Sequence, residues 1–458
     1  MTTRLFLPAL LFLLFSTTAP TARAELPAAP VDPGSVLADY VARPDDSFEW
    51  RQRTASNVGN GSEYVELILT SQTWKGIPWH HQLYIIRPAD VDKDSPHALL
   101  MVDGGRWRDA LLQPPESSEP LPDNAELFIE IAEHLRAPVA VLRHVPHQPL
   151  FDGLTEDHLI AKTFASFLET GDPDWPLLLP MVKSAVRAMD TVEAFAAQEW
   201  GLATNAFTVI GASKRGWTTW LTGAVDDRVA AIAPIVIDML NTDAYLRHAE
   251  RVWEQQSAEI EPYTELGLHE SLESPSRQAL LRIVDPWHYL ETLSLPKLLI
   301  LATNDEYWPL DTLNLYWDEL PGEKHVIYVP NNRHRVEDFT RIVTGVIALH
   351  EHAAGKARLP QMQWDYRSNA TNVELVVQSD PQPDRVRVWL AESDTRDMRK
   401  AEWTAHTVEP ENGRIRYRAE PATDRYRALF AEVEYTSDRA APLFLSTTVR
   451  VLEPDAAR

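Results

Sequence analysis

The sequence predicts an α/β protein with a doubly wound, mostly parallel sheet, followed by a smaller β-sandwich. Two patterns carry this prediction. From Trp50 to about Ala353, short apolar runs alternate with longer helical patterns, which is typical of buried strands joined by helical crossovers. After about Leu359, apolar and polar residues alternate with a period of two, as in strands with one buried face. The length of 458 residues is enough for two or three domains.

Residues 1–24 have the pattern of a cleaved secretory signal. Arg4 precedes an apolar run over residues 5–15, and Ala22-Arg23-Ala24 supplies small residues at the two positions that a signal peptidase reads. The run is shorter than the roughly 20 residues that a membrane-spanning helix needs. We therefore expect an exported chain, periplasmic or secreted, that begins near Glu25. The alternative is a retained N-terminal anchor, and no later stretch is long and apolar enough to span a membrane.

Residues 25–355 are expected to form the α/β domain, because six apolar runs in this range have the composition of strands buried on both faces. They are His97–Val102, Pro138–Leu142, Phe207–Ile210, Ala230–Ile237, Lys297–Leu301 and His325–Val329. The helical patterns between these runs supply the crossovers of a parallel sheet. The connection at residues 240–282 is long enough to form a lid over a site.

Residues 358–458 are expected to form a separate β-sandwich of immunoglobulin-like type, because roughly six short strands follow one another there. Apolar residues fall on one face of each strand, as at Val373, Leu375 and Val377 and again at Val386, Val388 and Leu390. The change of pattern places the boundary at residues 354–358.

Composition excludes several classes of protein. The chain has 43 basic and 67 acidic residues and a formal charge of −24, which argues against a protein that binds nucleic acid through a basic face. Loss of Arg4 and Arg23 with the signal leaves 41 basic residues against 67 acidic ones, or about −26. The sequence has no cysteine, so disulfides, thiolate metal sites and cysteine nucleophiles are excluded.

The stretch from Phe207 to Trp217 carries the main functional signal. A buried strand runs into Gly211-Ala212-Ser213 and then directly into a helical pattern, which is the context of the nucleophile elbow of α/β-hydrolases. Arg215 stands where the second glycine of that motif is usual, and Gly216 follows one place later. The alternative is a turn serine that caps a helix.

A serine nucleophile needs a histidine base and an acid that orients it, and in a doubly wound hydrolase they follow in the order serine, acid, histidine. Asp305 and His334 lie on loops after two predicted strands, in that order, so we predict a catalytic group of Ser213, Asp305 and His334. Asp311 is the competing acid, although it is placed to cap the next helix.

The remaining histidines are weaker candidates for the base. His80 and His81, like His144 and His147, follow or occupy other strands and do not match the expected order. We interpret them as hydrogen-bonded structural or surface residues, and the spacing of Asp and Glu around them does not support a metal site. No cofactor is implied.

Stabilisation of a developing oxyanion requires N–H donors beside the serine. The backbone N–H of Lys214 follows the nucleophile directly, and Gly105, in the loop after His97–Val102, lets a second backbone group approach closely. The alternative for Gly104-Gly105 is an ordinary tight turn.

Aromatic and basic residues near these positions are candidate substrate contacts. We assign Trp107, Arg215 and Trp308 to a substrate pocket beneath residues 240–282; the alternative is that the tryptophans are core residues and that Arg215 lies in solvent. Asp157 is interpreted as a helix cap rather than a ligand of the substrate.

As an ordered set, several motifs resemble the family of PhoPQ-activated pathogenicity-related proteins, which are secreted and similar to α/β-hydrolases. The motifs, which span roughly Trp50 to His350, are Val145–Pro149, Trp175–Met181, Arg187–Asp190, Gly211–Trp217, Asp285–Trp287, Leu320–His325, Pro330-Asn331 and His334. The resemblance implies catalytic roles for Ser213, Asp305 and His334, and it implies no substrate. The elbow also looks like that of glucuronoyl esterases, where a basic residue follows the serine.

These observations predict an exported serine hydrolase that cleaves an ester or amide through an acyl-enzyme intermediate. The acidic chain favours a basic peptide as substrate, whereas the aromatic residues and the appended sandwich favour a carbohydrate ester. The alternative function is a non-catalytic binding protein on a hydrolase scaffold. The oligomeric state and the contacts of the C-terminal segment are left open.

Overall fold

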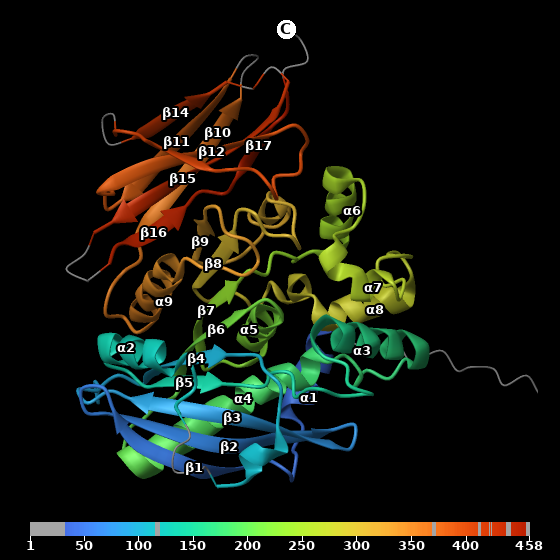
Figure 1. The fold of residues 1–458 in the computed structure, drawn as a ribbon, viewed down its shortest axis with the longest axis vertical. Helices are drawn as coiled ribbons and strands as arrows, with labels where there is room; N and C mark the ends of the chain where they lie inside the picture. Colours follow the sequence, from blue (N-terminus) through green and yellow to red (C-terminus); the bar gives the residue numbers. More distant parts are fainter. Residues whose placement is uncertain are drawn as a thin grey trace, which may run out of the picture. The chain divides into compact units, whose positions relative to one another are not determined.

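The computed structural model describes residues 33–114, 120–368, 372–410, 414–420, 422, 424–436 and 441–454 (Figure 1). The predicted signal segment, residues 1–24, lies outside the described residues. Within the described part, the main sheet has nine strands in the order β1-β2-β3-β5-β4-β6-β7-β8-β9. The strands are β1 (Glu49–Val58), β2 (Ser62–Trp74), β3 (Ile77–Arg87), β4 (His97–Val102), β5 (Val139–Leu142), β6 (Ala206–Ala212), β7 (Val229–Ile235), β8 (Lys297–Ala302) and β9 (Lys324–Val329).

The sheet is antiparallel at one edge and parallel through the rest. β1, β2, β3 and β5 pair antiparallel in succession, whereas every pair from β5 across to β9 is parallel. The six apolar runs predicted as strands correspond to β4 to β9. The predicted α/β fold with a doubly wound, mostly parallel sheet is therefore confirmed.

The central strands are apolar on both faces because helices cover both. Leu99 of β4 belongs to the hydrophobic cluster on the side of α2 and α9, while its neighbour Leu100 belongs to the cluster on the side of α4 and α5. Figure 1 shows these helices on either side of the strands. Their bounds are α2 (Ala125–Leu135), α4 (Leu178–Phe195), α5 (Lys214–Val225) and α9 (Phe339–Ala353).

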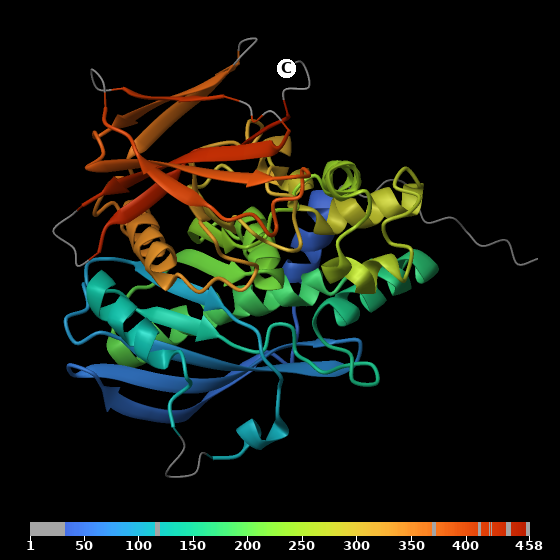
Figure 2. The same cartoon turned by 45° about the horizontal axis from the view of Figure 1, so that its top comes forward.

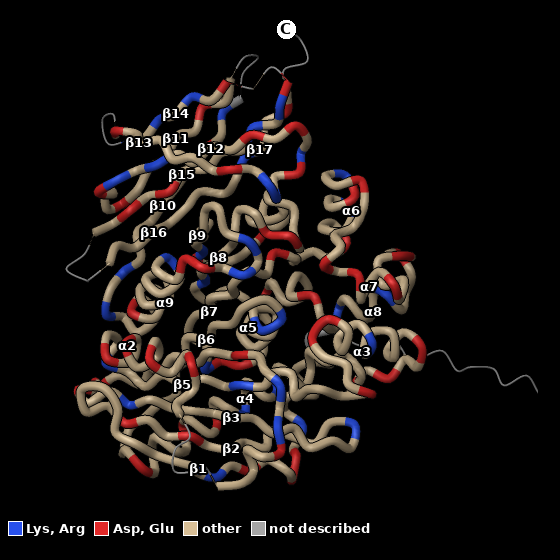
Figure 3. Tube along the Cα trace, in the orientation of Figure 1, with Lys and Arg blue, Asp and Glu red and all other residues tan. Residues whose placement is uncertain are grey.

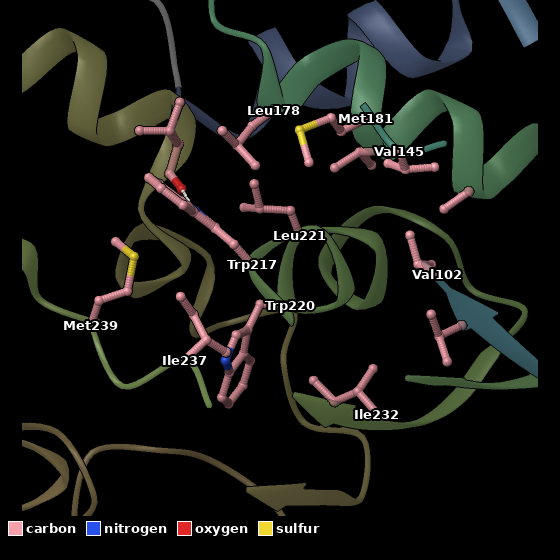
Figure 4. Close-up of a cluster of buried hydrophobic side chains, with 14 of the residues drawn as sticks. Val102, Val145, Leu178, Met181, Trp217, Trp220, Leu221, Ile232, Ile237 and Met239 are labelled. Carbon is pink, nitrogen blue, oxygen red and sulfur yellow. Dashed lines mark hydrogen bonds between the residues drawn. The ribbon is translucent and has the colours of Figure 1, made fainter. Parts of the chain in front are cut away.

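Helix α5, which follows the predicted elbow, is fixed by its apolar face. Figure 4 shows Trp217, Trp220 and Leu221 of this helix packed among buried side chains from the strands and from α4. The indole N–H of Trp217 donates a hydrogen bond to the carbonyl oxygen of Val284. Trp217 is therefore largely a core residue, and it joins the elbow to the segment after residue 240.

The connection at residues 240–282 folds into short helices that pack beside two other helices. It contains α6 (Thr242–Trp253), the turn η3 (Ala258–Ile260), α7 (Glu261–Thr264) and the start of α8 (Pro275–Val284). α7 and α8 contact α3 (Glu156–Thr170), and α8 also contacts α1 (Pro33–Ala42). Short helical turns elsewhere are η1 (Asp109–Leu112), η2 (Ala196–Trp200), η4 (Pro286–Tyr289) and η5 (Thr312–Leu315).

The C-terminal segment forms two antiparallel sheets with a shared apolar core, which confirms the predicted β-sandwich. One sheet has the order β10-β11-β14, and the other has the order β13-β12-β15-β16 with β17 also paired to β15. Figure 2 shows these strands, in orange and red, at the opposite end from β1 to β3 in blue. Their bounds are β10 (Gln361–Ser368), β11 (Val373–Asp380), β12 (Arg385–Ser393), β13 (Thr404–Thr407), β14 (Ile415–Ala419), β15 (Tyr426–Tyr435), β16 (Leu443–Ser446) and β17 (Arg450–Leu452).

The sandwich is joined to the α/β part by buried contacts. Helix α9 ends at Ala353 and β10 begins at Gln361, close to the predicted boundary. The ring of Phe430 lies 5.3 Å from that of Tyr328 in β9, and the guanidinium of Arg341 in α9 pairs with the fully buried carboxylate of Glu432. The two parts therefore share a hydrophobic core, and their division into independent domains stays a prediction.

Two central strands of the sheet carry no charged residue. Figure 3 shows β6 and β7 without charged residues, while Lys and Arg are scattered among Asp and Glu over the surrounding elements. Within the described ranges, no helix combines the length and apolar character needed to cross a membrane.

Candidate functional site

Ser213 lies at a sharp turn between β6 and α5. Its φ of 57° and ψ of −123° are unusual for a residue with a side chain, and they direct the chain from the strand straight into the helix. A Cβ atom at Gly211 would lie 2.5 Å from the carbonyl oxygen of Arg215, and one at Gly216 would lie 2.7 Å from a methyl group of Ile237. Close packing thus requires glycine at 211 and 216, whereas position 215 can carry a long side chain.

The structure brings Ser213, His334 and Asp305 into one hydrogen-bonded chain. The hydroxyl oxygen of Ser213 lies 2.9 Å from Nε2 of His334. Nδ1 of His334 lies 2.9 Å from Oδ2 and 3.0 Å from Oδ1 of Asp305. Asp305 follows β8 and His334 follows β9, so both side chains reach the serine from loops at the carboxyl ends of parallel strands.

The competing acid, Asp311, lies at a different place. Its carboxylate contacts Nε2 of His248 at 2.6 Å and the guanidinium of Arg396 at 2.7 Å. Asp311 occupies the N-cap position of η5, but its side chain does not cap that turn. Asp305 is therefore the carboxylate in contact with His334.

Neighbours of Asp305 fix the loop that carries it, and sequence analysis did not single them out. A carboxylate oxygen of Glu306 accepts a hydrogen bond of 2.9 Å from the backbone N–H of His334. The backbone N–H of Tyr307 donates to Asp305, and the Tyr307 ring lies over the imidazole of His334 with centroids 4.1 Å apart. Burial raises the pKa of Asp305, and the hydrogen bond and charge of His334 oppose that shift. The only feature of the sequence that could have indicated Glu306 and Tyr307 is that they directly follow Asp305.

The two backbone segments assigned to the oxyanion lie at the same edge of the sheet. Lys214 is the first residue of α5, and an N–H at the start of a helix has no acceptor within that helix. β4 and β6 are parallel neighbours, so the loop with Gly105 leaves the sheet beside Ser213. The φ of Gly105 is +123°, and a Cβ there would lie 3.0 Å from Nδ1 of His144, which explains the glycine.

The side chains of Lys214 and Arg215 are held by acidic residues at the start of α3. Nζ of Lys214 lies 2.7 Å from Oδ2 of Asp157, and the guanidinium of Arg215 forms a two-point contact with Glu156 at 2.7 and 2.8 Å. These contacts and the nearby cations lower the pKa of Glu156 to about 2 despite its burial. Asp157 thus binds Lys214 rather than acting as a cap.

A pocket of about 760 Å³, open to solvent at its mouth, adjoins Ser213 and is mainly apolar. Its walls come from α3, α5, the loop after β7, the helices of residues 240–282 and the loop after β8. The residues that line it are Asp157, Phe164, Ser213, Lys214, Trp217, Ile237, Met239, Thr242, Tyr245, Leu246, Ile260, Tyr263, Leu268, His269, Arg277, Leu281, Val284, Tyr307 and Trp308.

The three residues expected to bind substrate have different positions. Trp308 lines the pocket and packs against Tyr245, with ring centroids 5.2 Å apart. Trp107 packs against His80, His144 and His147, and neither Trp107 nor Arg215 is among the lining residues. The structure therefore brings Trp308 to the serine pocket and leaves the other two beside it.

His80, His81, His144 and His147 cluster around Trp79 and Trp107. His81 contacts the hydroxyl of Ser71 at 3.0 Å, and burial lowers the pKa of His144 to about 3. Across the residues that the structure describes, no group of three or more His, Cys, Asp or Glu side chains is arranged to hold a metal ion.

The parallel sheet and the serine at a strand-to-helix elbow define a protein of the α/β-hydrolase class. Comparison with known proteins then gives the family: the chain belongs to the PhoPQ-activated pathogenicity-related proteins, whose family model matches residues 37–399. Autocrine proliferation repressor protein A of Dictyostelium discoideum is 32% identical over 385 residues, which are 79% of this chain and 75% of that protein. The resemblance predicted from the motifs is therefore confirmed.

Solved structures with a similar arrangement include two carbohydrate esterases. Acetyl xylan esterase 1 from Thermoanaerobacterium sp. JW/SL YS485 has a TM-score of 0.47 and 14% identity, with 69% of this chain and 93% of that chain covered. A glucuronoyl esterase from Solibacter usitatus has a TM-score of 0.40 and 13% identity, with 67% and 88% covered.

Proposed function

We propose that this protein is a serine hydrolase that cleaves an ester or amide bond through an acyl-enzyme intermediate. The observation that carries the proposal is the hydrogen-bonded chain from Ser213 through His334 to Asp305, with the serine at the wall of a mainly apolar pocket. A serine, a histidine and a buried carboxylate in this arrangement supply a nucleophile, a base and an orienting acid.

In the proposed reaction the oxygen of Ser213 attacks the substrate carbonyl carbon while Nε2 of His334 takes the hydroxyl proton. Asp305 accepts a hydrogen bond from Nδ1–H and so keeps the proton-free nitrogen directed at the serine. The imidazolium then gives its proton to the leaving alcohol or amine as the carbonyl re-forms. In the second half, water attacks the carbonyl carbon of the acyl group while His334 takes its proton. His334 then returns the proton to the oxygen of Ser213 as the bond to the acyl group breaks, which releases the acid.

The negative charge of the tetrahedral intermediate needs donors that are in place beforehand. We assign the backbone N–H of Lys214 and a backbone N–H of the Gly105 loop to this task, because both segments lie beside Ser213. Loss of one such donor typically costs about 3 kcal/mol in activation free energy. The short helices of residues 240–282, which wall the pocket, are proposed to act as its lid.

The proposal includes export. Residues 1–24 supply the signal pattern, and a chain without cysteine can fold in a compartment without forming disulfides. N-terminal sequencing of the protein from the extracytoplasmic fraction of an expressing bacterium is expected to begin near Glu25. Recovery of an uncleaved chain from the membrane fraction would support the N-terminal anchor instead.

A fluorophosphonate probe tests the proposed nucleophile. The wild-type protein is expected to be labelled, and Ser213→Ala is expected to abolish labelling. Ser95→Ala, which changes a serine in the turn before β4, is the matched control and should be labelled fully. A folded wild-type protein that resists the probe would favour the alternative function, a non-catalytic binding protein on a hydrolase scaffold.

A substrate panel then separates the bond types. p-Nitrophenyl esters, aminoacyl anilides and the methyl ester of glucuronic acid represent simple esters, peptides and carbohydrate esters. The class with the highest kcat/KM defines the activity, and Ser213→Ala should lose it in each case.

A further inference from the structure

Arg277 is a buried cation without a partner in the pocket beside Ser213. It lies on α8, lines the same pocket as the serine and is 6% exposed. Within the part of the chain that the structure describes, its guanidinium forms no ion pair and donates no hydrogen bond, and its Nε is fully buried. Burying an unpaired charge is unfavourable, so an anionic ligand that reached this arginine would be bound favourably.

The carboxylates nearest to Arg277 are engaged elsewhere. Asp285 accepts hydrogen bonds from the backbone N–H groups of Thr242 and Trp287, and Oδ2 of Asp243 accepts one from the side chain of Gln278. The negative charges of both carboxylates raise the pKa of Arg277, although both lie beyond ion-pair distance from it. Oδ1 of Asp243 is itself buried without a partner. Desolvation lowers the pKa of Arg277, and the charges of Asp243 and Asp285 offset this shift only in part.

The other charged groups of the pocket do not compete for the same ligand. Lys214 and Asp157 form an ion pair with each other, and the hydroxyl of Tyr263 donates to Asp157. His269 also lines the pocket, and its Nδ1 is buried without a partner. The indole Nε1 of Trp308, another lining residue, is likewise buried without a partner. Arg277, His269 and Trp308 can therefore all donate hydrogen bonds to an anion, His269 when its imidazole carries a proton on Nδ1, and Arg277 is the group with a fixed charge.

Most of the remaining wall is apolar. Phe164, Leu246, Leu281 and Val284 contribute side chains to the same cavity. A ligand that satisfies both features has an apolar part along these residues and an anionic group at Arg277. A carboxylate fits best, because the planar guanidinium matches it with two parallel hydrogen bonds.

We infer that the group of the substrate that enters this pocket is an apolar chain ending in a carboxylate, and that Arg277 binds this carboxylate while Ser213 attacks the ester or amide. The inference rests on the proposed hydrolase function and names its substrate class. An anionic substrate contrasts with the overall charge of −24, which favours cations at long range. The two are compatible because a single buried arginine acts only within the pocket.

Two esters that differ only at the chain end test the inference. The mono-p-nitrophenyl ester of adipic acid carries a terminal carboxylate, and p-nitrophenyl hexanoate has a methyl group in its place. The wild-type enzyme is expected to prefer the adipate ester at least tenfold in kcat/KM. Arg277→Met should abolish this preference, whereas Arg282→Met, on the same helix but outside the pocket lining, should leave the preference intact.

Three results would overturn the inference: equal rates on both esters, a wild-type preference for hexanoate, or an undiminished preference in folded Arg277→Met. Arg277→Lys keeps the charge but loses the planar guanidinium, and it serves if the methionine variant does not fold. Its preference for the adipate ester should fall, and a preference equal to that of wild type would count against binding of the carboxylate by the guanidinium. Calorimetric titration with free adipate should show binding to the wild type and at least tenfold weaker binding to whichever Arg277 variant folds.

The titration also keeps the inference separate from the proposed function. If the fluorophosphonate probe and both esters fail to react, the hydrolase proposal is wrong, while adipate binding that depends on Arg277 still supports an anion site. If the probe labels Ser213 and adipate does not bind, the hydrolase proposal stands and the carboxylate inference is wrong.

Discussion

At the scale of single residues, Asp305 contacts Nδ1 of His334 and is the acid proposed to orient it. Replacing it by asparagine keeps the size of the side chain and removes the charge that favours a proton on Nδ1 of His334. We expect Asp305→Asn to fold and to lose about 10⁴-fold in kcat, the loss typical of this change in serine hydrolases. Steady-state kinetics on a p-nitrophenyl ester, with circular dichroism as a check of folding, measures it.

Asp311→Asn is the matched control for that variant. Its carboxylate contacts His248 and Arg396 and is remote from the serine, so the change should lower stability but reduce kcat far less. A larger loss of kcat in Asp311→Asn than in Asp305→Asn would contradict the assignment of the acid.

Asp238, buried after β7, predicts a pH dependence of stability. Burial raises its pKa to about 8, and the hydroxyl of Tyr316 donates to its Oδ1 at 2.7 Å. In the unfolded chain its pKa is about 3.9. Between these values the folded chain holds a proton that the unfolded chain has released, so this residue makes stability fall as pH rises, by up to about 1.4 kcal/mol per unit.

Asp238→Asn removes that contribution because the amide does not titrate. Urea unfolding at several pH values should show the stability of the variant, relative to wild type, increasing from pH 4 to pH 8 and then levelling. Asp227→Asn, at an exposed carboxylate, should show no such trend. Parallel curves for Asp238→Asn and wild type would contradict the raised pKa.

The sequence was sufficient to locate residues whose position follows from the order of the strands along the chain. Ser213, Asp305 and His334 each come directly after an apolar strand, and parallel strands bring such loops to one edge. Arg277 was not predicted as a pocket residue, because it lies on a helical insertion and no periodicity in the sequence indicates which side of that insertion faces the serine. The same holds for the ion pair between Asp157 and Lys214, whose partners are far apart in the sequence.

At the scale of elements, the loops after β8 and β9 are tied to one segment of the sandwich part. The side-chain amide of Asn304 donates to the carbonyl oxygen of Ala401 at 2.7 Å. Asn331 exchanges two hydrogen bonds with the backbone of Trp403, at 2.8 and 2.9 Å. Asn304 directly precedes Asp305, and Asn331 lies three residues before His334. Residues 398–403 therefore position both side chains.

Asn331→Ala is therefore expected to lower kcat/KM by roughly 10- to 100-fold, since small displacements of catalytic groups have effects of that size. Asn314→Ala removes a similar contact, a 2.9 Å hydrogen bond to the carbonyl oxygen of Val449, from a turn that carries no catalytic residue. Its kcat/KM should stay within about twofold of wild type; comparable losses in both variants would indicate a general effect on stability instead.

Secondary structure was predictable where both faces of a strand are buried. The run His97–Val102 matches β4 at both ends because all its environment is apolar. The antiparallel strands β1 to β3 were not delimited, because β1 lies at the edge and is largely exposed, so its sequence has no continuous apolar run. The sandwich strands showed the expected alternation, as in β11, where residues 373, 375 and 377 are buried.

At the scale of the whole molecule, the two parts depend on each other. Trp403, Ala428 and Phe430 belong to the same hydrophobic cluster as the central sheet. A chain of residues 25–355 would expose the partners of these side chains to water. We expect it to be insoluble or to lack cooperative urea unfolding, in contrast to residues 25–458, and a soluble, probe-reactive 25–355 fragment would show that the α/β part is an independent domain.

The contacts of Asn304 and Asn331 with residues 398–403 also affect when the site becomes complete. Ribosomes make the chain from its N-terminus, so Ser213, Asp305 and His334 all exist before the segment that holds their loops has been synthesised. A nascent chain, or one cut short by proteolysis near residue 400, would carry all three side chains without the contacts that align them. We therefore expect the proposed activity to appear only after residues 398–403 have been synthesised and have packed against these two loops.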